Sequence, residues 1–399
     1  MRVIRTFAII ASVFFVSFAT AQAQSAAGQP GAFLRLGAGA RALALGGAFS
    51  AIADDPSAGY WNPAGLSQLN RIHFSATHYK MSLDRTHNFI AGALPLGYSS
   101  TIGLSWIGLG VNGIEARSGN TAQPDFIFSN SYNALLLSFA QKINPYLSLG
   151  LNVKGLYQKL YNVDASGFGF DASFLVRPTD NIRFGISVQD ISSSVKWSTG
   201  RKETLPLTYR GGVALNVTDN LVLAVDAYKI GQDSPGLAWG VEYRALNLMP
   251  IRLGYSDQGV AAGAGVAVPL QSMDLSIDYA FGKDQIDGGE THKLSIGFAL
   301  FKKSSTGYDV AETYRRSSTD LSSPPDKSTV KGNKEVYLKV LAKGLNVRTG
   351  PGVENEKIGV IYKDQEYKKV TAAGYWYQIE LEPGKYGWVH HKYVKEVLK

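Results

Sequence analysis

The sequence predicts an all-β protein: a transmembrane antiparallel β-barrel of about 14 strands with a short N-terminal helical plug, followed by a second, much smaller β-barrel domain. Three observations support this. The 399 residues include 43 Gly, 21 Tyr and 18 Phe but only 18% charged residues, a composition that suits sheet better than helix. Residues 71–301 alternate apolar with small or polar side chains. An apolar segment follows two arginines at the N-terminus, as in exported proteins.

Residues 1–24 are predicted to be a signal peptide. Arg2 and Arg5 precede an apolar run at 7–18, and small residues surround the expected cleavage site near Gln24. The run is shorter than the about 20 residues of a spanning helix, and a buried N-terminal helix is the alternative. The absence of cysteine excludes disulfides, thiol catalysis and Cys-ligated zinc.

The alternating segments of 71–301 are each about 8 to 13 residues long, close to the about 9–11 residues that a tilted membrane strand requires. We place their starts near residues 71, 86, 98, 131, 146, 165, 181, 205, 220, 236, 250, 258, 272 and 291. Short turns alternate with connections that are often longer, such as 109–130 and 191–204. Outer-membrane barrels keep their short turns in the periplasm. An even number of strands would therefore leave the residues after 301 in the periplasm.

A soluble β-sandwich would alternate in the same way. The polar faces favour the barrel, because they carry mainly Gly, Ala and Ser, which suit a crowded lumen. The charged residues expected on this inner face are Lys154, Asp171, Arg183, Arg210, Asp226, Glu242, Arg252, Asp274 and Asp278. The aromatic residues expected at the membrane interfaces are Trp106, Tyr157, Tyr161, Trp239 and Tyr243.

Residues 25–70 precede the first strand and differ from the barrel. Residues 38–53 are rich in Ala, Leu and Gly and predict a short helix that stops at the Asp-Asp-Pro of 54–56. An apolar helix ahead of a barrel must be buried, and the lumen is the natural place. A cap on the periplasmic rim is the alternative.

Three motifs in this segment carry a family resemblance: GARALALGGA at 39–48, ADDPSA at 53–58 and WNPAGL at 61–66. Together they resemble the opening of the PorV/PorQ family, outer-membrane proteins similar to the FadL fatty-acid transporters. The resemblance implies a FadL-like barrel of about 14 strands. It also implies that the motif belongs to the plug, with Asp54, Asp55, Trp61, Asn62, Pro63 and Gly65 as its marked residues.

The C-terminal part predicts a linker at 302–334, rich in Ser, Lys, Pro and Asp, and a domain at 335–399. GLNVRTGPG at 344–352, GYWYQI at 374–379 and YGWV at 386–389 resemble the signature of bacterial SH3-like domains. Such domains bind peptides or peptidoglycan, and aromatic-lined grooves hold ligands in this way. The groove candidates are Arg348, Trp376, Tyr377, Tyr386 and Trp388.

Catalysis is not predicted, and neither is a cofactor, a metal or a nucleic-acid partner. His73, His78 and His87 lie near the first strands, but no nucleophile motif surrounds them. The pair His390 and His391 is weak evidence for a metal site. The net charge of +8 reflects mainly the residues after 301 and indicates no nucleic-acid footprint.

The resulting hypothesis is a non-enzymatic outer-membrane protein that acts in protein secretion or surface attachment. Its expected partners are outer-membrane lipid, secreted cargo proteins, and peptidoglycan or a periplasmic protein that the C-terminal domain binds. The first alternative is a FadL-like transporter of hydrophobic compounds, which requires an apolar lumenal pocket and an interruption in strand pairing. The second is a structural link between outer membrane and cell wall.

Overall fold

The computed structural model describes residues 29–245, 248–270, 272–284, 289–300, 336–342, 344–352, 355–373, 376–382 and 385–398. They form two compact units, 29–300 and 336–398, and each is described by itself. The predicted signal peptide, the predicted linker, residues 25–28 and Glu335 lie outside the described residues. Within the described ranges, no helix has the length and apolar character to span a membrane.

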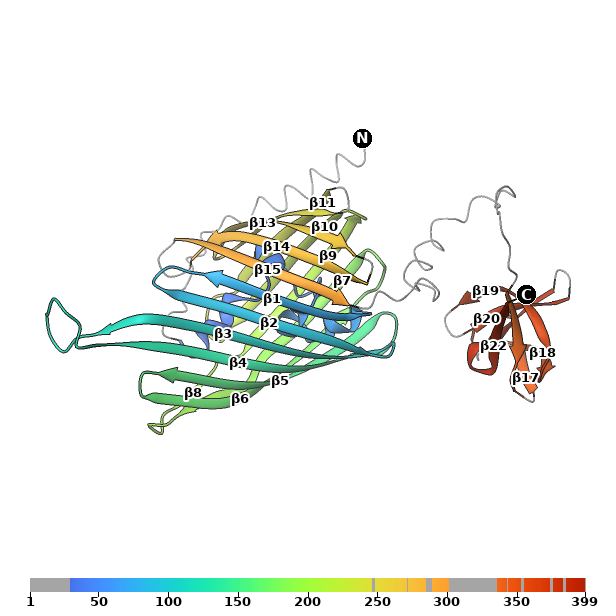
Figure 1. Cartoon of the computed structure of the whole chain (residues 1–399), viewed down its shortest axis with the longest axis horizontal. Helices are drawn as coiled ribbons and strands as arrows, with labels where there is room; N and C mark the ends of the chain where they lie inside the picture. The colour runs from blue at the N-terminus through green and yellow to red at the C-terminus, as the bar shows by residue number, and fades with distance from the viewer. Residues whose placement is uncertain are drawn as a thin grey trace. The chain divides into compact units, whose positions relative to one another are not determined.

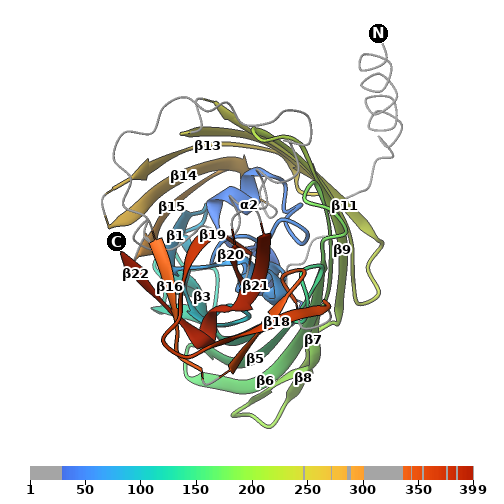
Figure 2. The same cartoon turned by 90° about the vertical axis from the view of Figure 1, so that its right-hand side faces the viewer.

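The larger unit is a closed antiparallel β-barrel of 14 strands (Figures 1 and 2). Each strand pairs with its neighbours, and β1 pairs with β15 to close the ring. The short β8 (Lys202–Thr204) pairs with β7 but is not one of the 14 strands that close the barrel. This confirms the predicted fold class. The strands are β1 (Ile72–Lys80), β2 (Arg85–Leu96), β3 (Ser100–Ala116), β4 (Phe126–Lys142), β5 (Leu147–Leu160), β6 (Val163–Val176), β7 (Ile182–Trp197), β9 (Thr208–Thr218), β10 (Leu221–Ile230), β11 (Gly236–Ala245), β12 (Met249–Ser256), β13 (Gly259–Pro269), β14 (Met273–Lys283) and β15 (Glu290–Leu300).

The β3–β4 hairpin is longer than the sequence predicts. Both strands have 17 residues, so the expected long connection at 109–130 is wrong and only 117–125 join them. A bulge between Val111 and Ile114 absorbs the Asn112-Gly113 pair, where Gly113 has a φ of 68°. The bulge lets the two-stranded ribbon continue beyond this point. The hairpin projects past the neighbouring strands (Figure 1), and we call that end of the barrel the hairpin end.

The opposite end, where β1 begins and β15 ends, carries short connections and is called the short-turn end. Connections there include 97–99, 143–146 and 219–220. The longest connections in the ring, 117–125 and 198–207, lie at the hairpin end. Two connections at the hairpin end, 161–162 and 257–258, are also short.

The two faces of the barrel differ in chemistry. Exposed apolar side chains cover the outer face, among them Phe74, Leu104, Leu137 and Ile186. Small or polar residues of the same strands, such as Ser105 and Ser138, are buried toward the lumen. Such an outer face matches hydrocarbon rather than water.

The chain before β1 lies inside the ring of strands (Figure 2). It forms η1 (Ala32–Leu36), α2 (Ala40–Ala44), α3 (Ala58–Trp61) and η2 (Pro63–Gln68). We call residues 29–70 the plug. Glycines on the inner wall let its backbone approach closely. A Cβ built on Gly150 would lie 2.0 Å from the Ala64 nitrogen, and one on Gly254 would lie 2.2 Å from the Gly46 nitrogen.

The smaller unit is a seven-stranded sheet in the order β18-β17-β21-β20-β19-β16-β22. Its core consists of buried aliphatic residues such as Leu338, Val347 and Ile379. The strands are β16 (Val336–Val340), β17 (Gly344–Arg348), β18 (Lys357–Tyr362), β19 (Glu366–Ala373), β20 (Trp376–Glu382), β21 (Lys385–His390) and β22 (Val394–Leu398), with η3 (His391–Tyr393) between the last two.

The contact between plug and wall predicts an asymmetry between two glycines of β5. Gly150→Ala places a methyl group against the plug backbone, whereas Gly155→Ala meets nothing within 4 Å. Gly150→Ala is expected to destabilise the protein by ~1–3 kcal/mol through overpacking, and Gly155→Ala to leave it unchanged. The heat-induced mobility shift of the folded barrel on SDS gels measures this. Equal transition temperatures for the two variants would contradict it.

Candidate functional site: a plugged lumen with a cavity at the hairpin end

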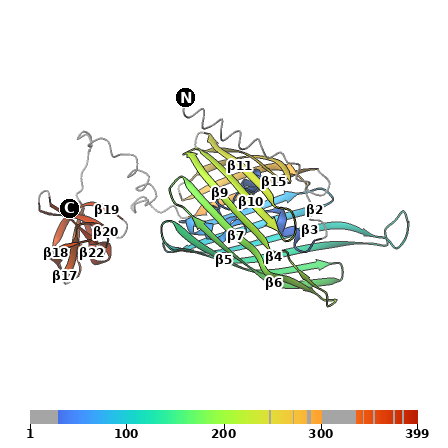
Figure 3. The same cartoon turned by 180° about the vertical axis from the view of Figure 1, so that it is seen from behind.

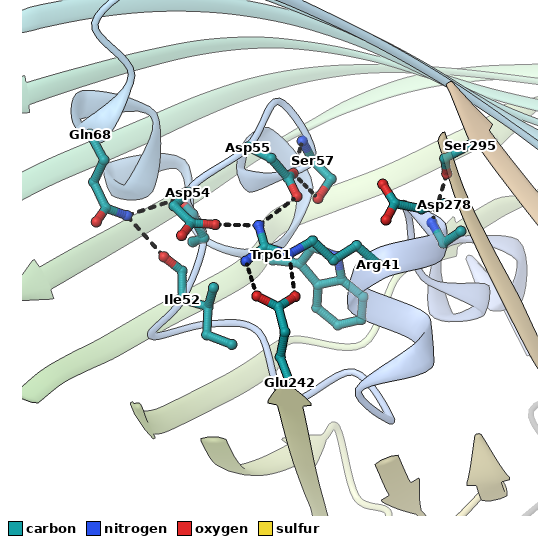
Figure 4. A network of polar contacts seen from close by, with 12 residues as sticks. Arg41, Ile52, Asp54, Asp55, Ser57, Trp61, Gln68, Glu242, Asp278 and Ser295 are labelled. Carbon is teal, nitrogen blue, oxygen red and sulfur yellow. Dashed lines mark hydrogen bonds and ion pairs between the residues drawn. The ribbon is translucent and has the colours of Figure 1, made fainter. Parts of the chain in front are cut away.

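Arg41 of α2 joins the plug to the barrel wall (Figure 4). Its guanidinium donates to both oxygens of Glu242, at 2.8 and 3.0 Å, and to Asp54 at 2.5 Å. Glu242 of β11 also accepts from Arg252 at 2.7 Å, and Arg252 donates to Asp278 at 2.6 Å. Glu242 is almost fully buried, so these pairings are what allow a carboxylate there.

The two adjacent plug aspartates have different environments. Burial alone would raise the pKa of Asp54, but the guanidinium groups of Arg41 and Arg183 outweigh it and hold that pKa below its ordinary value. Burial raises the pKa of Asp55, and the nearby Arg41 guanidinium offsets this rise only in part. The Asp55 carboxylate instead accepts from the backbone and hydroxyl of Ser57, at 2.8 and 2.5 Å. Asp54 therefore binds Arg41 closely, while Asp55, 3.5 Å from Arg41, mainly fixes the turn into α3.

The remaining motif residues hold the plug together. The Trp61 indole donates to the Ala38 carbonyl at 2.8 Å. Asn62 donates to the carbonyls of Ser50, at 2.7 Å, and of Phe174 in the wall, at 3.0 Å. Its side-chain oxygen caps η2 by accepting from the Ala64 nitrogen.

Pro63 occupies the first turn of η2, where its missing N–H costs nothing. Gly65 is needed because a Cβ there would lie 2.2 Å from the Ala53 carbonyl oxygen. Local packing thus explains the six marked motif residues, Asp54, Asp55, Trp61, Asn62, Pro63 and Gly65, without a ligand.

Two further ion pairs lie on the inner wall. Lys154 contacts Asp171 at 2.8 Å and also Asp190. Arg210 lies 3.4 Å from Asp226, and its guanidinium stacks on the rings of Trp61 and Tyr228. The alternation had placed most of these charges on the inner face. Asp190 was not singled out, because it lies in a bulge that breaks the period of two.

The lumen contains a cavity of about 180 Å³ at the hairpin end. The connections 231–235 and 257–258 border it, and its apolar wall includes Leu34, Leu36 and Trp61. Its polar lining includes Arg35, Arg210, Lys293, Asp190, Asp233 and Asp257. Arg35 is paired with Asp233 at 3.4 Å, and Asp257 accepts from the Tyr228 hydroxyl. Toward the short-turn end, the buried plug residues Leu45, Phe49 and Ile52 pack against the wall, so the cavity has a closed floor.

The wall beside this cavity is irregular. Pairing of β6 with β7 shifts register twice, between Phe168 and Phe170 and between Phe170 and Ala172. Asp190 and Ser192 of β7 have positive φ angles of 63° and 53°. We call this stretch the seam. Gln189 and Asp190 line both the cavity and a smaller one of about 20 Å³, which is large enough for about one water molecule. The irregular pairing and the cavity therefore meet at the seam, whose strands are visible in Figure 3.

In the C-terminal domain the predicted groove residues divide between two faces. Arg348 and Trp388 are register partners, and Trp376 is the partner of His390, against whose ring it packs at 5.3 Å. Trp376, Tyr386 and Trp388 occupy alternate positions on adjacent strands and share one face. Tyr377 does not share it. Its register partner is the fully buried Val389, and it packs against the core.

The histidines are not gathered into a site. His87 is buried in the lumen and stacks on Tyr79, while the exposed His78 bonds Asn88 at 2.7 Å. In the described parts of the chain, no three His, Cys, Asp or Glu side chains are grouped to hold a metal ion.

Comparisons with known proteins agree with both units. Residues 343–395 match the family model of the bacterial SH3 domain. The barrel resembles the toluene transporter TodX of Pseudomonas putida, with 14% identity, a TM-score of 0.51, and coverage of 66% of this chain and 98% of TodX. CymD, a monoaromatic hydrocarbon channel, matches with 13% identity and a TM-score of 0.48 over 67% and 98% of the two chains. A Pseudomonas aeruginosa FadL homologue matches with 13% identity and a TM-score of 0.45 over 63% and 95%.

No curated protein sequence matches the chain. At these identities the likeness to TodX shows the fold alone. The predicted FadL-like barrel and the predicted SH3-like domain are thus confirmed as folds.

The ion network predicts that Arg41→Ala is costly. It leaves the buried Glu242 with fewer partners and should reduce stability by ~3–5 kcal/mol, as expected when one partner of a buried pair is removed. Arg117→Ala is the control, because its pair with Glu115 is exposed and should contribute less than about 1 kcal/mol. Denaturant midpoints of the purified barrel measure both. Similar midpoints would show that the network does not stabilise the plug.

Proposed function

We propose that this chain is an outer-membrane protein whose barrel binds small apolar or amphipathic molecules at the hairpin end and releases them through the seam. The observation that carries the proposal is the cavity with a closed floor beside the doubly bulged β6–β7 pairing. Because the plug fills the lumen toward the short-turn end, a molecule in the cavity has no straight path. The irregular wall is the alternative exit.

The size of the cavity limits its ligand. An engineered cavity of about 150 Å³ binds benzene, so about 180 Å³ suits a single aromatic ring better than a long acyl chain. The mixed lining also admits a polar substituent. TodX, whose fold is similar, is described as a toluene transporter, and toluene is therefore the first probe to use.

A cross-link across the seam tests the proposal. The chain has no cysteine, so Phe170→Cys with Ile191→Cys introduces one pair of thiols at register partners within the seam. Oxidation should reduce uptake of labelled toluene by cells several-fold, and reduction should restore it. The control, Phe174→Cys with Ile186→Cys, joins register partners in the regular part of the same strand pair. If the oxidised seam variant takes up toluene as fast as the wild type does, release through the seam is refuted.

A second candidate function is protein secretion or surface attachment, as in the PorV/PorQ family that the plug motif resembles. The protruding hairpin favours it. Phe126 and Tyr161 are 43% and 49% exposed and stack on each other at 4.9 Å. Phe126 lies seven residues along β4 from Asn133, which accepts a hydrogen bond from Trp106. This exposed apolar pair is suited to contact a partner protein.

In either case we propose that the C-terminal domain lies in the periplasm. The barrel begins and ends at the short-turn end, which faces the periplasm in outer-membrane barrels. There the face with Trp376, Tyr386 and Trp388 would bind the cell wall or a protein partner.

Quantitative proteomics of the culture medium and cell surface tests the second candidate. A strain with Phe126→Ser and Phe128→Ser should lose a defined set of exported proteins if the hairpin docks cargo. Ile127→Ser, on the opposite face of the strand, should not. A full set of exported proteins in the strain that lacks this chain would exclude a role in secretion.

A further inference from the structure

Three lysines gather on the outer face of the barrel near the hairpin end. Lys159 lies on β5, Lys196 on β7 and Lys202 on β8, and all three side chains are exposed. They point outward, because the adjacent Gln158 and Val195 are buried on the lumenal side.

The strand register fixes their spacing. Lys196 and Lys202 are direct partners. Lys159 is the partner of Asp164 on β6, and Lys196 is the partner of Ser166, two residues further along the same strand. Two strand spacings of about 4.8 Å and two residues of about 3.3 Å separate the Cα atoms of Lys159 and Lys196 by roughly 12 Å.

The charge of this cluster is not neutralised by the protein. None of the three lysines forms an ion pair with another residue that the structure describes. Arg201 is paired with Glu203 at 3.2 Å and adds no net charge. Asp164 is the acidic residue between the lysines, so three positive charges and one negative leave a net charge of two.

Apolar side chains lie directly beside the lysines, toward the short-turn end. Tyr157, Phe168 and Phe170 are 46%, 63% and 41% exposed on the same outer face. Tyr157 is the partner of Asn133, which accepts a hydrogen bond from Trp106, and both aromatic residues are predicted to lie at the membrane interface. The lysines therefore lie just beyond the aromatic level, at the depth of lipid headgroups.

We infer that the lysine cluster binds the phosphates of a phosphorylated lipid in the outer leaflet, whose acyl chains lie against the exposed aromatic residues. The spacing of roughly 12 Å between lysines suits a headgroup with two phosphates. Elsewhere at this end, Lys80 and Lys229 are outward-facing lysines without a second lysine as register partner. The inference rests on the membrane location proposed above.

The test uses the full chain in phosphatidylcholine nanodiscs, to which bis-phosphorylated lipid A is added as probe. Native mass spectrometry counts the lipid A molecules retained on the protein. Lys159→Gln with Lys196→Gln should reduce retention about tenfold or more, since each lysine near a charged lipid surface contributes substantially. The matched control, Lys80→Gln with Lys229→Gln, removes the same charge and should retain lipid A as the wild type does.

Two further arms identify the ligand. Lipid A without its phosphates should be retained poorly, and inorganic phosphate should not displace the bound lipid. Equal retention by the two double variants, or of the dephosphorylated lipid, would overturn the inference and leave the proposed function intact. Failure of the chain to enter the nanodisc would overturn both.

Discussion

A ring of 14 strands encloses more space than its own side chains can fill, and the rest of this structure follows from that constraint. Barrels of about eight strands are filled by side chains, whereas larger ones need a plug or hold water. Here residues 29–70 occupy the lumen. The side chains on the inner wall are correspondingly small, with glycines at the closest contacts, because the plug backbone itself fills the space.

The charged side chain of Arg41 lies between the plug and the wall, where it pairs with a charge of opposite sign. Arg41 reaches from the plug to Glu242 on the wall, and Arg252 continues the network to Asp278. Since a buried charge is tolerated only with partners, the pair between Arg41 and Glu242 also fixes where the plug lies. The same interactions that stabilise the fold thereby close one end of the lumen and leave the cavity at the other.

The features that suit interaction with other molecules gather at the hairpin end. The cavity opens there, the seam lies beside it, and the lysine cluster is on the outer face of the same strands, β5 to β8. This grouping has a physical origin. Bulges interrupt the regular pairing of a strand and turn side chains in new directions, and they are common at barrel rims and beside binding sites. The small-molecule and partner-protein roles proposed for this end need not exclude each other.

The sequence by itself determined the barrel, its strand number and the inner position of residues such as Lys154 and Glu242, because alternation along a strand is a local property. It also indicated the SH3-like fold through short motifs. The cavity, the seam and the ion network around Arg41 were decided only by the tertiary structure. Arg41 and Glu242 are about 200 residues apart in the chain. No local sequence pattern indicates which wall residue a plug residue will contact. The bulge at Asp190 and the long β3–β4 hairpin escaped prediction for a related reason, since both break the regular period from which the strands were recognised.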